Sequence, residues 1–230
     1  MPQLPIADVY ALAVFLIVWL FYQPLLDFIG RGRGINRDMV FIRRAWMEAM
    51  VRRENRFMDA NLIGHVLSSA SFFASTNLLV IAAVIGALFG GEQTWKAISG
   101  FSLLARSSPL LFDIKLTLIA FALVRGLLDF IWAIRQLNYF LGIMGAAPET
   151  LGPAKTAYGE AAAALLDPAL SAFSTGVRGY YFALAAAAWL MGPYAAIAAT
   201  VGAAWLLIHR QLGSPAAKGI ARLRALVEKG

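Results

Sequence analysis

One stretch decides the fold class of this chain: Leu116-Thr-Leu-Ile-Ala-Phe-Ala-Leu-Val-Arg125-Gly-Leu-Leu-Asp129-Phe-Ile-Trp-Ala-Ile-Arg135. As a helix it is long and apolar enough to cross a bilayer, which takes about 20 mostly apolar residues. Arg125 and Asp129 nevertheless fall near its middle, where an ion is costly unless it is paired or faces a polar interior. Their spacing of four residues puts both side chains on one helix face, and Gln136 falls close to that face. The stretch therefore predicts a membrane-spanning helix with one sheltered polar side.

The composition extends this prediction to the whole chain. Of its 230 residues, 60% are hydrophobic and 14% are charged, whereas a soluble domain has about 45–50% apolar and about 25% charged residues. The chain has no cysteine and two histidines, which argues against disulfides, thiolate ligands and the usual zinc sites. We therefore expect no cofactor and no metal.

Four apolar stretches are long enough to be membrane spans, and they cover residues 8–29, 65–90, 116–140 and 179–208. We predict an all-α helical membrane bundle of four transmembrane helices, forming a single integral membrane domain over residues 1–230. Its expected location is the cell membrane, which in a bacterium is the inner membrane. Residues 146–177, punctuated by three prolines, are predicted as a long loop with a short helix candidate at residues 157–166, and residues 209–230 as a polar basic tail.

The last apolar stretch is too long for one untilted span and too short for two. Gly192-Pro193 lies near its middle. We predict a single helix that is kinked or tilted at this dipeptide. The alternative is a re-entrant hairpin of two half-helices, an arrangement that lines the binding site in some transporters.

Eight arginines lie between Arg31 and Arg56. Residues 36–62 place apolar side chains at helical spacing opposite charged ones, which predicts a basic amphipathic helix that lies along anionic lipid headgroups or packs under the bundle. Asn36 or Asp38 is expected to cap its start. In a membrane protein, such an excess of arginine indicates the cytoplasmic face rather than nucleic-acid binding.

The distribution of Lys and Arg leaves the side of the tail open. With the arginine-rich segment inside, four spans put the tail outside and give 11 basic residues inside against 8 outside. A re-entrant last stretch brings the tail inside, and the counts become 16 against 3. The positive-inside rule favours the re-entrant arrangement, whereas hydrophobic length favours four spans.

Two sets of polar residues are candidate sites. The first is an intramembrane polar site in which the serine-rich second span faces the third: Arg125, Asp129, Gln136, Ser71 and Ser75. The second is an interfacial polar cluster near the ends of the predicted helices: Arg43, Glu54, Asn61, His65, Arg135 and Asn138. Snorkelling with local pairing is the simpler interpretation of the second set, and a polar vestibule is the alternative.

Small residues line one face of the second predicted span, so that a neighbouring backbone can come close to it. They are Gly64, Ser68, Ser71, Ser75, Ala82 and Gly86. Tight helix packing is the simpler interpretation, because serine in a span usually bonds to its own helix. A polar pathway is the alternative.

Four segments, read together, resemble the domain-of-unknown-function family 599, uncharacterised multi-span membrane proteins of bacteria and plants. They are Asn36-Arg-Asp-Met-Val-Phe-Ile-Arg-Arg-Ala-Trp46 with Arg53-Glu-Asn-Arg56, Ser71-Phe-Phe-Ala-Ser-Thr76, Ile134-Arg-Gln-Leu-Asn-Tyr139 and Arg178-Gly-Tyr-Tyr-Phe-Ala-Leu184. The resemblance implies a helical membrane protein, and it implies no activity and no catalytic residue.

The sequence is compatible with two functions. The first is a channel or transporter for a small ion or solute, built on the mid-membrane Arg125/Asp129 pair. The second is a non-catalytic scaffold, assembly factor or accessory subunit, with a homo-oligomer or a larger membrane complex as partner. An enzyme is not expected, since neither an HExxH nor a GxSxG motif occurs.

Overall fold

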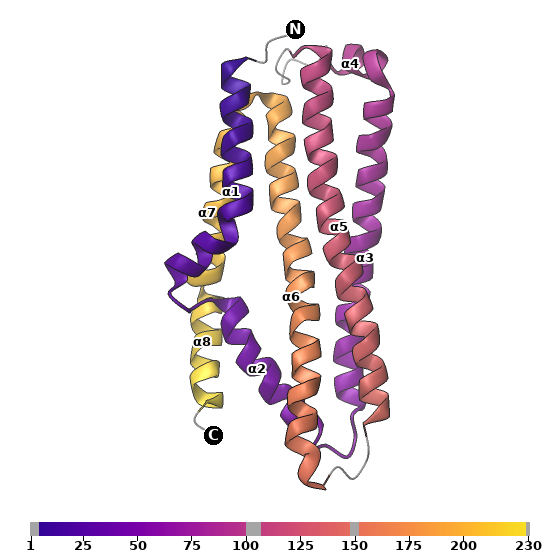
Figure 1. Ribbon diagram of the computed structural model, residues 1–230, viewed down its shortest axis with the longest axis vertical. Coiled ribbons are helices and arrows are strands. Elements are labelled where there is room, and N and C mark those ends of the chain that lie inside the picture. The colour runs from indigo at the N-terminus through magenta and orange to yellow at the C-terminus, as the bar shows by residue number, and fades with distance from the viewer. Residues whose placement is uncertain (1–4, 100–106, 148–151, 229–230) are drawn as a thin grey trace. The chain divides into compact units, whose positions relative to one another are not determined.

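The structure is a computed structural model of the chain that describes residues 5–99, 107–147 and 152–228. Within these ranges the chain is helical, which confirms the predicted all-α class (Figure 1). The helices are α1 Ile6–Gly30, α2 Ile35–Met50, α3 Phe57–Phe89, α4 Gly91–Ser99, α5 Pro109–Ala146, α6 Lys155–Ala187, α7 Pro193–Leu212 and α8 Pro215–Val227, with short 3-10 turns at Gly152–Ala154 and Ala188–Met191.

Four helical segments of the described chain are long and apolar enough to cross a membrane: α1, α3, α5 and the segment Pro193–Val227, which joins α7 and α8. Between 11% and 33% of the most apolar window of each is buried within the chain. Most of their apolar side chains therefore need an apolar surrounding, and these helices support a multi-pass membrane protein.

The chain divides into two compact units, and α3, α5, α6 and α7 each contribute residues to both. Unit 1 comprises Met1–Ile29, Thr76–Leu127 and Gly176–Ile208, and unit 2 comprises Gly30–Ser75, Leu128–Thr175 and His209–Gly230. The single membrane domain stays a prediction.

In unit 1, the core forms where α1, α5 and the turn between α6 and α7 meet. Ala11, Leu111, Trp189 and Ala196 are buried together. The backbones of α5 and α6 come very close, because a Cβ added at Gly179 would lie 3.3 Å from the Cα of Gly126. Glycine at both positions thus permits this approach.

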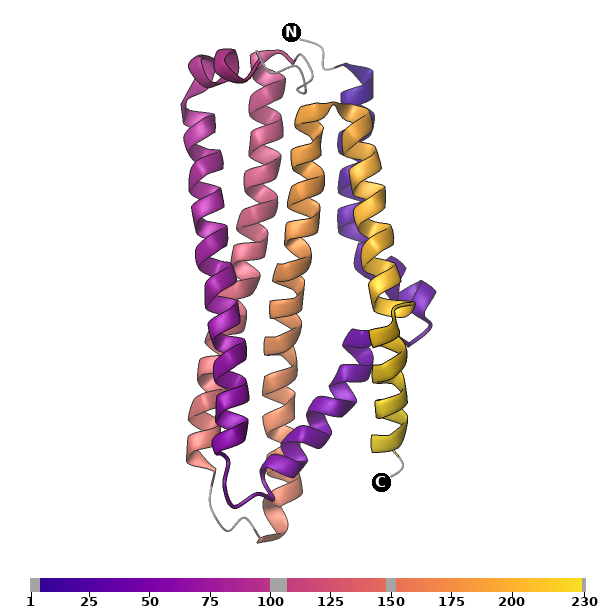
Figure 2. The same ribbon diagram turned by 180° about the vertical axis from the view of Figure 1, so that it is seen from behind.

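The last apolar stretch is not one helix, so the predicted kinked span is wrong. Helix α6 ends at Ala187, and α7 begins at Pro193. Gly192 has a φ of 131°, a conformation that favours glycine, and Pro193 suits the first position of the next helix. Within unit 1, α6 and α7 therefore lie side by side as a helical hairpin (Figures 1 and 2).

The short helix expected at residues 157–166 lies within α6, but the long loop predicted around it is wrong, since residues 155–177 all belong to α6. Its start is rich in alanine, and alanine has the highest helix propensity of all residue types. Pro168 lies inside α6, where it removes one backbone hydrogen bond without ending the helix. Packing against α2, described below, stabilises this part of α6.

Unit 2 has its own core between α2, α3, α5 and α6. It is formed by Met47, Met50, Val51, Ile63, Leu137, Phe140, Met144, Ala162, Ala163, Leu166 and Ala169. The rings of Phe73 and Phe130 stack with centroids 5.7 Å apart. This core fixes α2 against the long helices.

The predicted amphipathic helix over residues 36–62 is interrupted. Helix α2 ends at Met50, and α3 begins at Phe57. Oδ1 of Asn55 accepts a hydrogen bond from the Phe57 backbone N–H at 2.8 Å, which stabilises the new helix start. Neither Asn36 nor Asp38 caps α2, because both lie inside the helix. The N-cap residue is Gly34, and no side chain makes a capping hydrogen bond there. The location of α2 at a membrane interface stays a prediction.

The predicted polar tail contains a helix. Ser214 caps α8 by accepting a hydrogen bond from the Ala217 backbone N–H at 3.1 Å. Helix α8 packs on α2, where the Arg224 guanidinium lies 3.9 Å from the centre of the Phe41 ring. The tail and the arginine-rich segment are therefore neighbours.

Candidate functional site

The residues of the predicted intramembrane site differ in burial. Ser71, Ser75 and Arg125 are exposed, Asp129 is half-buried and Gln136 is buried. Nε2 of Gln136 donates to the Trp132 carbonyl of its own helix at 3.5 Å, and Arg125 and Asp129 each take part in a polar or electrostatic interaction. Arg125 belongs to unit 1 and the other four to unit 2. A common site of the five residues stays a prediction.

The residues of the predicted interfacial cluster also differ. Glu54, Asn61, His65, Arg135 and Asn138 are exposed, whereas Arg43 is buried. Arg135 donates to the Tyr139 hydroxyl at 2.8 Å and Asn138 to the Ile134 carbonyl at 3.0 Å, so both bond within α5. Of this set, Arg43 alone enters the interior of unit 2.

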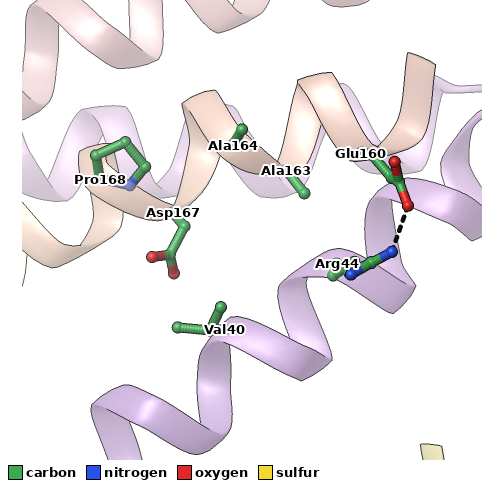
Figure 3. A pocket seen from close by; sticks show the side chains of 7 residues that line it. All are labelled: Val40, Arg44, Glu160, Ala163, Ala164, Asp167 and Pro168. Atoms are coloured by element: carbon green, nitrogen blue, oxygen red, sulfur yellow. Dashed lines mark hydrogen bonds and ion pairs between the residues drawn. The ribbon is translucent and has the colours of Figure 1, made fainter. Parts of the chain in front are cut away.

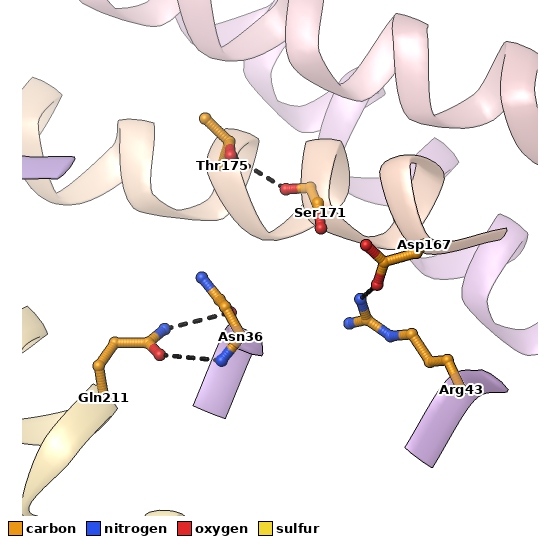
Figure 4. A network of polar contacts seen from close by, with 6 residues as sticks. All are labelled: Asn36, Arg43, Asp167, Ser171, Thr175 and Gln211. Atoms are coloured by element: carbon orange, nitrogen blue, oxygen red, sulfur yellow. Dashed lines mark hydrogen bonds and ion pairs between the residues drawn. The ribbon is translucent and has the colours of Figure 1, made fainter. Parts of the chain in front are cut away.

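Arg43 forms an ion pair with α6. Its Nη1 lies 2.5 Å from Oδ1 of Asp167 (Figure 4). The next residue along α2, Arg44, pairs with Glu160 of α6. A Cβ added at Gly159 would lie 3.2 Å from the Cα of Glu48, so the two backbones nearly touch beside these pairs. Two ion pairs and one close approach thus join α2 to α6.

A cavity of about 350 Å³ lies between α2 and α6 next to these ion pairs (Figure 3). It is lined by Val40, Arg44, Glu160, Ala163, Ala164, Asp167 and Pro168. Because Pro168 has no N–H, the Ala164 carbonyl lacks its usual helical donor. The wall therefore combines two carboxylates, one guanidinium and one under-bonded carbonyl. We call this the α2–α6 cavity.

A second polar network joins the start of α2 to α7 and α8. The Asn36 backbone N–H donates to Oε1 of Gln211, and Nε2 of Gln211 donates to Oδ1 of Asn36, both at 3.3 Å (Figure 4). Arg224 pairs with Asp38 at 2.8 Å and with Glu228 at 3.0 Å. Figure 4 also shows Ser171 and Thr175 of α6, where the Thr175 hydroxyl donates to the Ser171 carbonyl at 3.0 Å.

The end of α2 is held by Asp59, which is fully buried at the start of α3. Its Oδ1 accepts a hydrogen bond from Nε1 of Trp46 at 2.7 Å and pairs with Arg53. Sequence reasoning missed this cluster, because an acid in the first turn of a helix commonly lies on the surface.

Unit 1 contains a buried ion pair that sequence reasoning also missed. Nζ of Lys115 lies 3.8 Å from Oδ1 of Asp8 and 3.0 Å from Oγ of Ser107. The same Asp8 oxygen accepts a hydrogen bond from Nε1 of Trp189 at 2.7 Å. Both charged residues stand near the ends of apolar stretches, where charges need no partner, so nothing local in the sequence indicates that they meet.

Comparison with known proteins gives one result. Residues 10–216 match the model of a family described as protein of unknown function, DUF599. This chain belongs to that family. The resemblance found in the sequence is thereby confirmed. The match includes the α2–α6 cavity and the Asn36–Gln211 contact, and it ends at residue 216, before Arg224 and Glu228 of α8. No curated protein and no solved structure matches the chain.

The polar residues of this DUF599 protein at the α2–α6 cavity form charge pairs. No group of three or more His, Cys, Asp or Glu residues in the described ranges could hold a metal ion. At the α2–α6 cavity, a carboxylate that leaves its arginine can bind a cation, and the released guanidinium can bind an anion.

Proposed function

We propose that this protein is a channel or transporter for a small ion or polar solute, and that the α2–α6 cavity is its polar vestibule. The proposal keeps transport as the function but bases it on Arg43 and Asp167 in addition to Arg125 and Asp129. The single observation that carries it is a cavity lined by opposite charges in a chain whose long helices are otherwise apolar.

The size and chemistry of the cavity support passage of something small. Its volume of about 350 Å³ is several times the roughly 30 Å³ that a water molecule occupies in the liquid. The Arg43–Asp167 pair borders it, and the Asp167 side chain is 25% exposed. A permeating ion can therefore exchange with one member of the pair, which is how charged rings select ions at the mouths of channels.

The position of α8 supports a cytoplasmic vestibule. Since α8 contacts α2, the tail lies on the same side as the segment from Arg31 to Arg56. With Arg178 lying within α6, this arrangement gives 15 basic residues inside and 3 outside, in line with the positive-inside rule. We therefore propose that α6 and α7 both cross the cell membrane.

Flux through proteoliposomes tests the proposal. Uptake of K⁺, Na⁺, Cl⁻ and protons is measured for the purified chain and for Arg43→Gln, Asp167→Asn and Arg125→Ala. We expect the first two variants to change flux or ion preference at least fivefold. Arg52→Gln is the matched control, because Arg52 is exposed and does not line the cavity. Unchanged flux in folded Arg43 and Asp167 variants, or no flux above empty liposomes, contradicts the proposal.

A second candidate is a non-catalytic scaffold or accessory subunit, and one observation favours it. Along α3, Gly64 has nothing within 4 Å of an added Cβ, and Ser68, Ser71 and Ser75 are exposed. Gly64 and these three serines are therefore uncovered within the described part of unit 2, and a helix of another chain could pack closely there.

Cross-linking separates this candidate from the first. The chain has no native cysteine, so Ser71→Cys introduces a single thiol. Rapid cross-linking in native membranes, to a second copy or to another protein, supports a subunit role. Leu79→Cys, at another exposed α3 position, is the control. Absence of any Ser71-specific product, together with purification as a monomer without companions, argues against it.

A further inference from the structure

A second cavity, of about 560 Å³, lies in unit 2 between the start of α2 and α8. It is lined by Arg33, Gly34, Asp38, Gln211, Leu212, Ala217, Lys218, Ala221, Arg224, Ala225 and Glu228. None of these residues lines the α2–α6 cavity. We call this space the α2–α8 cavity.

Its charges leave a basic rim. The two acids of the lining, Asp38 and Glu228, both pair with Arg224. In the described parts of the chain no ion pair engages Arg33 or Lys218, and both side chains are exposed. The cavity therefore presents two cationic groups to a ligand, while its acids are already occupied.

The backbone beside Arg33 also favours an anion. Helix α2 begins after Gly34 without a side-chain cap, so the positive end of its dipole lies here, although the Asn36 N–H already donates to Gln211. The preceding turn is built from positive φ angles, 84° at Gly32 and 137° at Gly34. Within this turn the Arg33 N–H donates to the Gly30 carbonyl at 2.8 Å, which orders the backbone beside the Arg33 side chain.

The α8 side of the cavity is partly apolar. Leu212 and three alanines of α8, Ala217, Ala221 and Ala225, form this part, next to Lys218, Arg224 and Glu228 of the same helix. Leu212 ends α7, and its Cδ2 lies 3.2 Å from a Cβ added at Gly30, which ends α1. Two apolar helices thus end beside the cavity, which is the level where a membrane helix meets lipid headgroups.

We propose that the α2–α8 cavity binds an anionic phospholipid. Arg33 and Lys218 contact the phosphate oxygens, and the alanine wall receives the glycerol and the first acyl carbons. A basic rim next to an apolar wall at the end of membrane helices fits an anionic lipid better than a soluble phosphate, which has no apolar part. This site is independent of the proposed transport.

Lipid retention measured by native mass spectrometry tests the site. The full chain is purified in detergent, delipidated and titrated with dioleoylphosphatidylglycerol, dioleoylphosphatidylcholine or glycerol 3-phosphate. We expect the phosphatidylglycerol adduct to form at concentrations at least tenfold lower than either of the others. The double variant Arg33→Gln/Lys218→Gln should weaken it roughly 10- to 30-fold, since each basic residue near an anionic headgroup contributes about fivefold.

The matched control is Arg52→Gln/Arg222→Gln, which removes the same net charge at exposed positions outside the cavity. It should change retention less than twofold. If the double variant does not purify as a folded protein, Lys218→Gln alone should weaken phosphatidylglycerol about fivefold. Equal binding of the two lipids, or an equal loss in the control pair, overturns the site. Glycerol 3-phosphate binding as tightly as phosphatidylglycerol overturns the lipid assignment.

Discussion

Both units bury an ion pair, but they do so differently. In unit 1, the side chains of Lys115 and Asp8 are 1% and 8% exposed, and Trp189 and Ser107 take up their remaining bonds. In unit 2, Asp167 is 25% exposed and lies at the wall of a cavity. A sealed pair holds helices together and has no access to a ligand, whereas a pair beside a cavity can exchange partners. The charges near α2 are therefore the better candidates for function.

The largest effect is expected at the sealed pair. Lys115→Met leaves the Asp8 carboxylate buried without its cation, which should lower the free energy of unfolding by about 3–5 kcal/mol. Denaturant unfolding in mixed micelles measures it. The double variant Asp8→Asn/Lys115→Met should recover most of the loss, because it leaves no unpaired charge in the interior.

Lys96→Met on α4 provides the control for that measurement. Lys96 pairs with Glu92, but the two side chains are 65% and 70% exposed, and surface pairs of this kind contribute little. A loss at Lys115 no larger than that at Lys96 would mean that the pair is not sealed, and the comparison between the units would fail.

A smaller loss is expected at the open pair. Arg43→Gln removes the partner of Asp167, which water in the cavity can partly solvate, so the free energy of unfolding should fall by about 1.5–3 kcal/mol. The same denaturation experiment measures it. A larger loss of unfolding free energy than that of Lys115→Met would show Asp167 to be the more deeply buried acid. It would argue against the proposal that the α2–α6 cavity is a vestibule.

The next effect concerns close packing rather than charge. Gly179→Ala places a methyl group 3.3 Å from the backbone of Gly126, which should lower the unfolding free energy by about 1–2 kcal/mol. Gly202→Ala is the control, since nothing lies within 4 Å of its Cβ, and it should raise the unfolding free energy by up to about 1 kcal/mol. Equal changes in thermal midpoint at the two positions would refute the close approach of α5 and α6.

The smallest effect is expected at the rim of the α2–α6 cavity. Arg44 and Glu160 have side chains that are 55% and 48% exposed, so Arg44→Gln should cost less than about 1 kcal/mol. Its effect on flux, however, should approach that of Arg43→Gln, because Arg44 lines the cavity. A large stability loss without any change in flux would make Arg44 a purely structural residue.

The sequence predicted what depends on local properties. Hydrophobic length and helical spacing within single segments were enough for the all-α class and for apolar helices that support a membrane protein. The errors arose where contacts with other helices determine the structure of a segment. Residues 155–177 contain Pro168, which is typical of a loop, yet they are helical, because alanine favours a helix at their start and packing on α2 stabilises it.

The site was predicted only in part, for the same reason. Arg43 was selected because a charge on an apolar face needs a partner, but its partner Asp167 lies in a different helix. Asp8 and Lys115 are more than a hundred residues apart, and each is unremarkable in its own segment. Contacts between distant residues leave no periodic signal in a single sequence, so these pairs emerge only from the fold.

Pro168 makes α6 easier to bend beside the α2–α6 cavity. A helix bends most easily where one of its backbone hydrogen bonds is missing. Here the missing bond is the one between residue 168 and the Ala164 carbonyl, and both residues line the α2–α6 cavity. Flexing of α6 at this hinge would change the aperture of the cavity directly. Pro168→Ala would restore this hydrogen bond and stiffen α6. The substitution therefore reduces the mobility of the cavity wall while leaving its shape nearly unchanged.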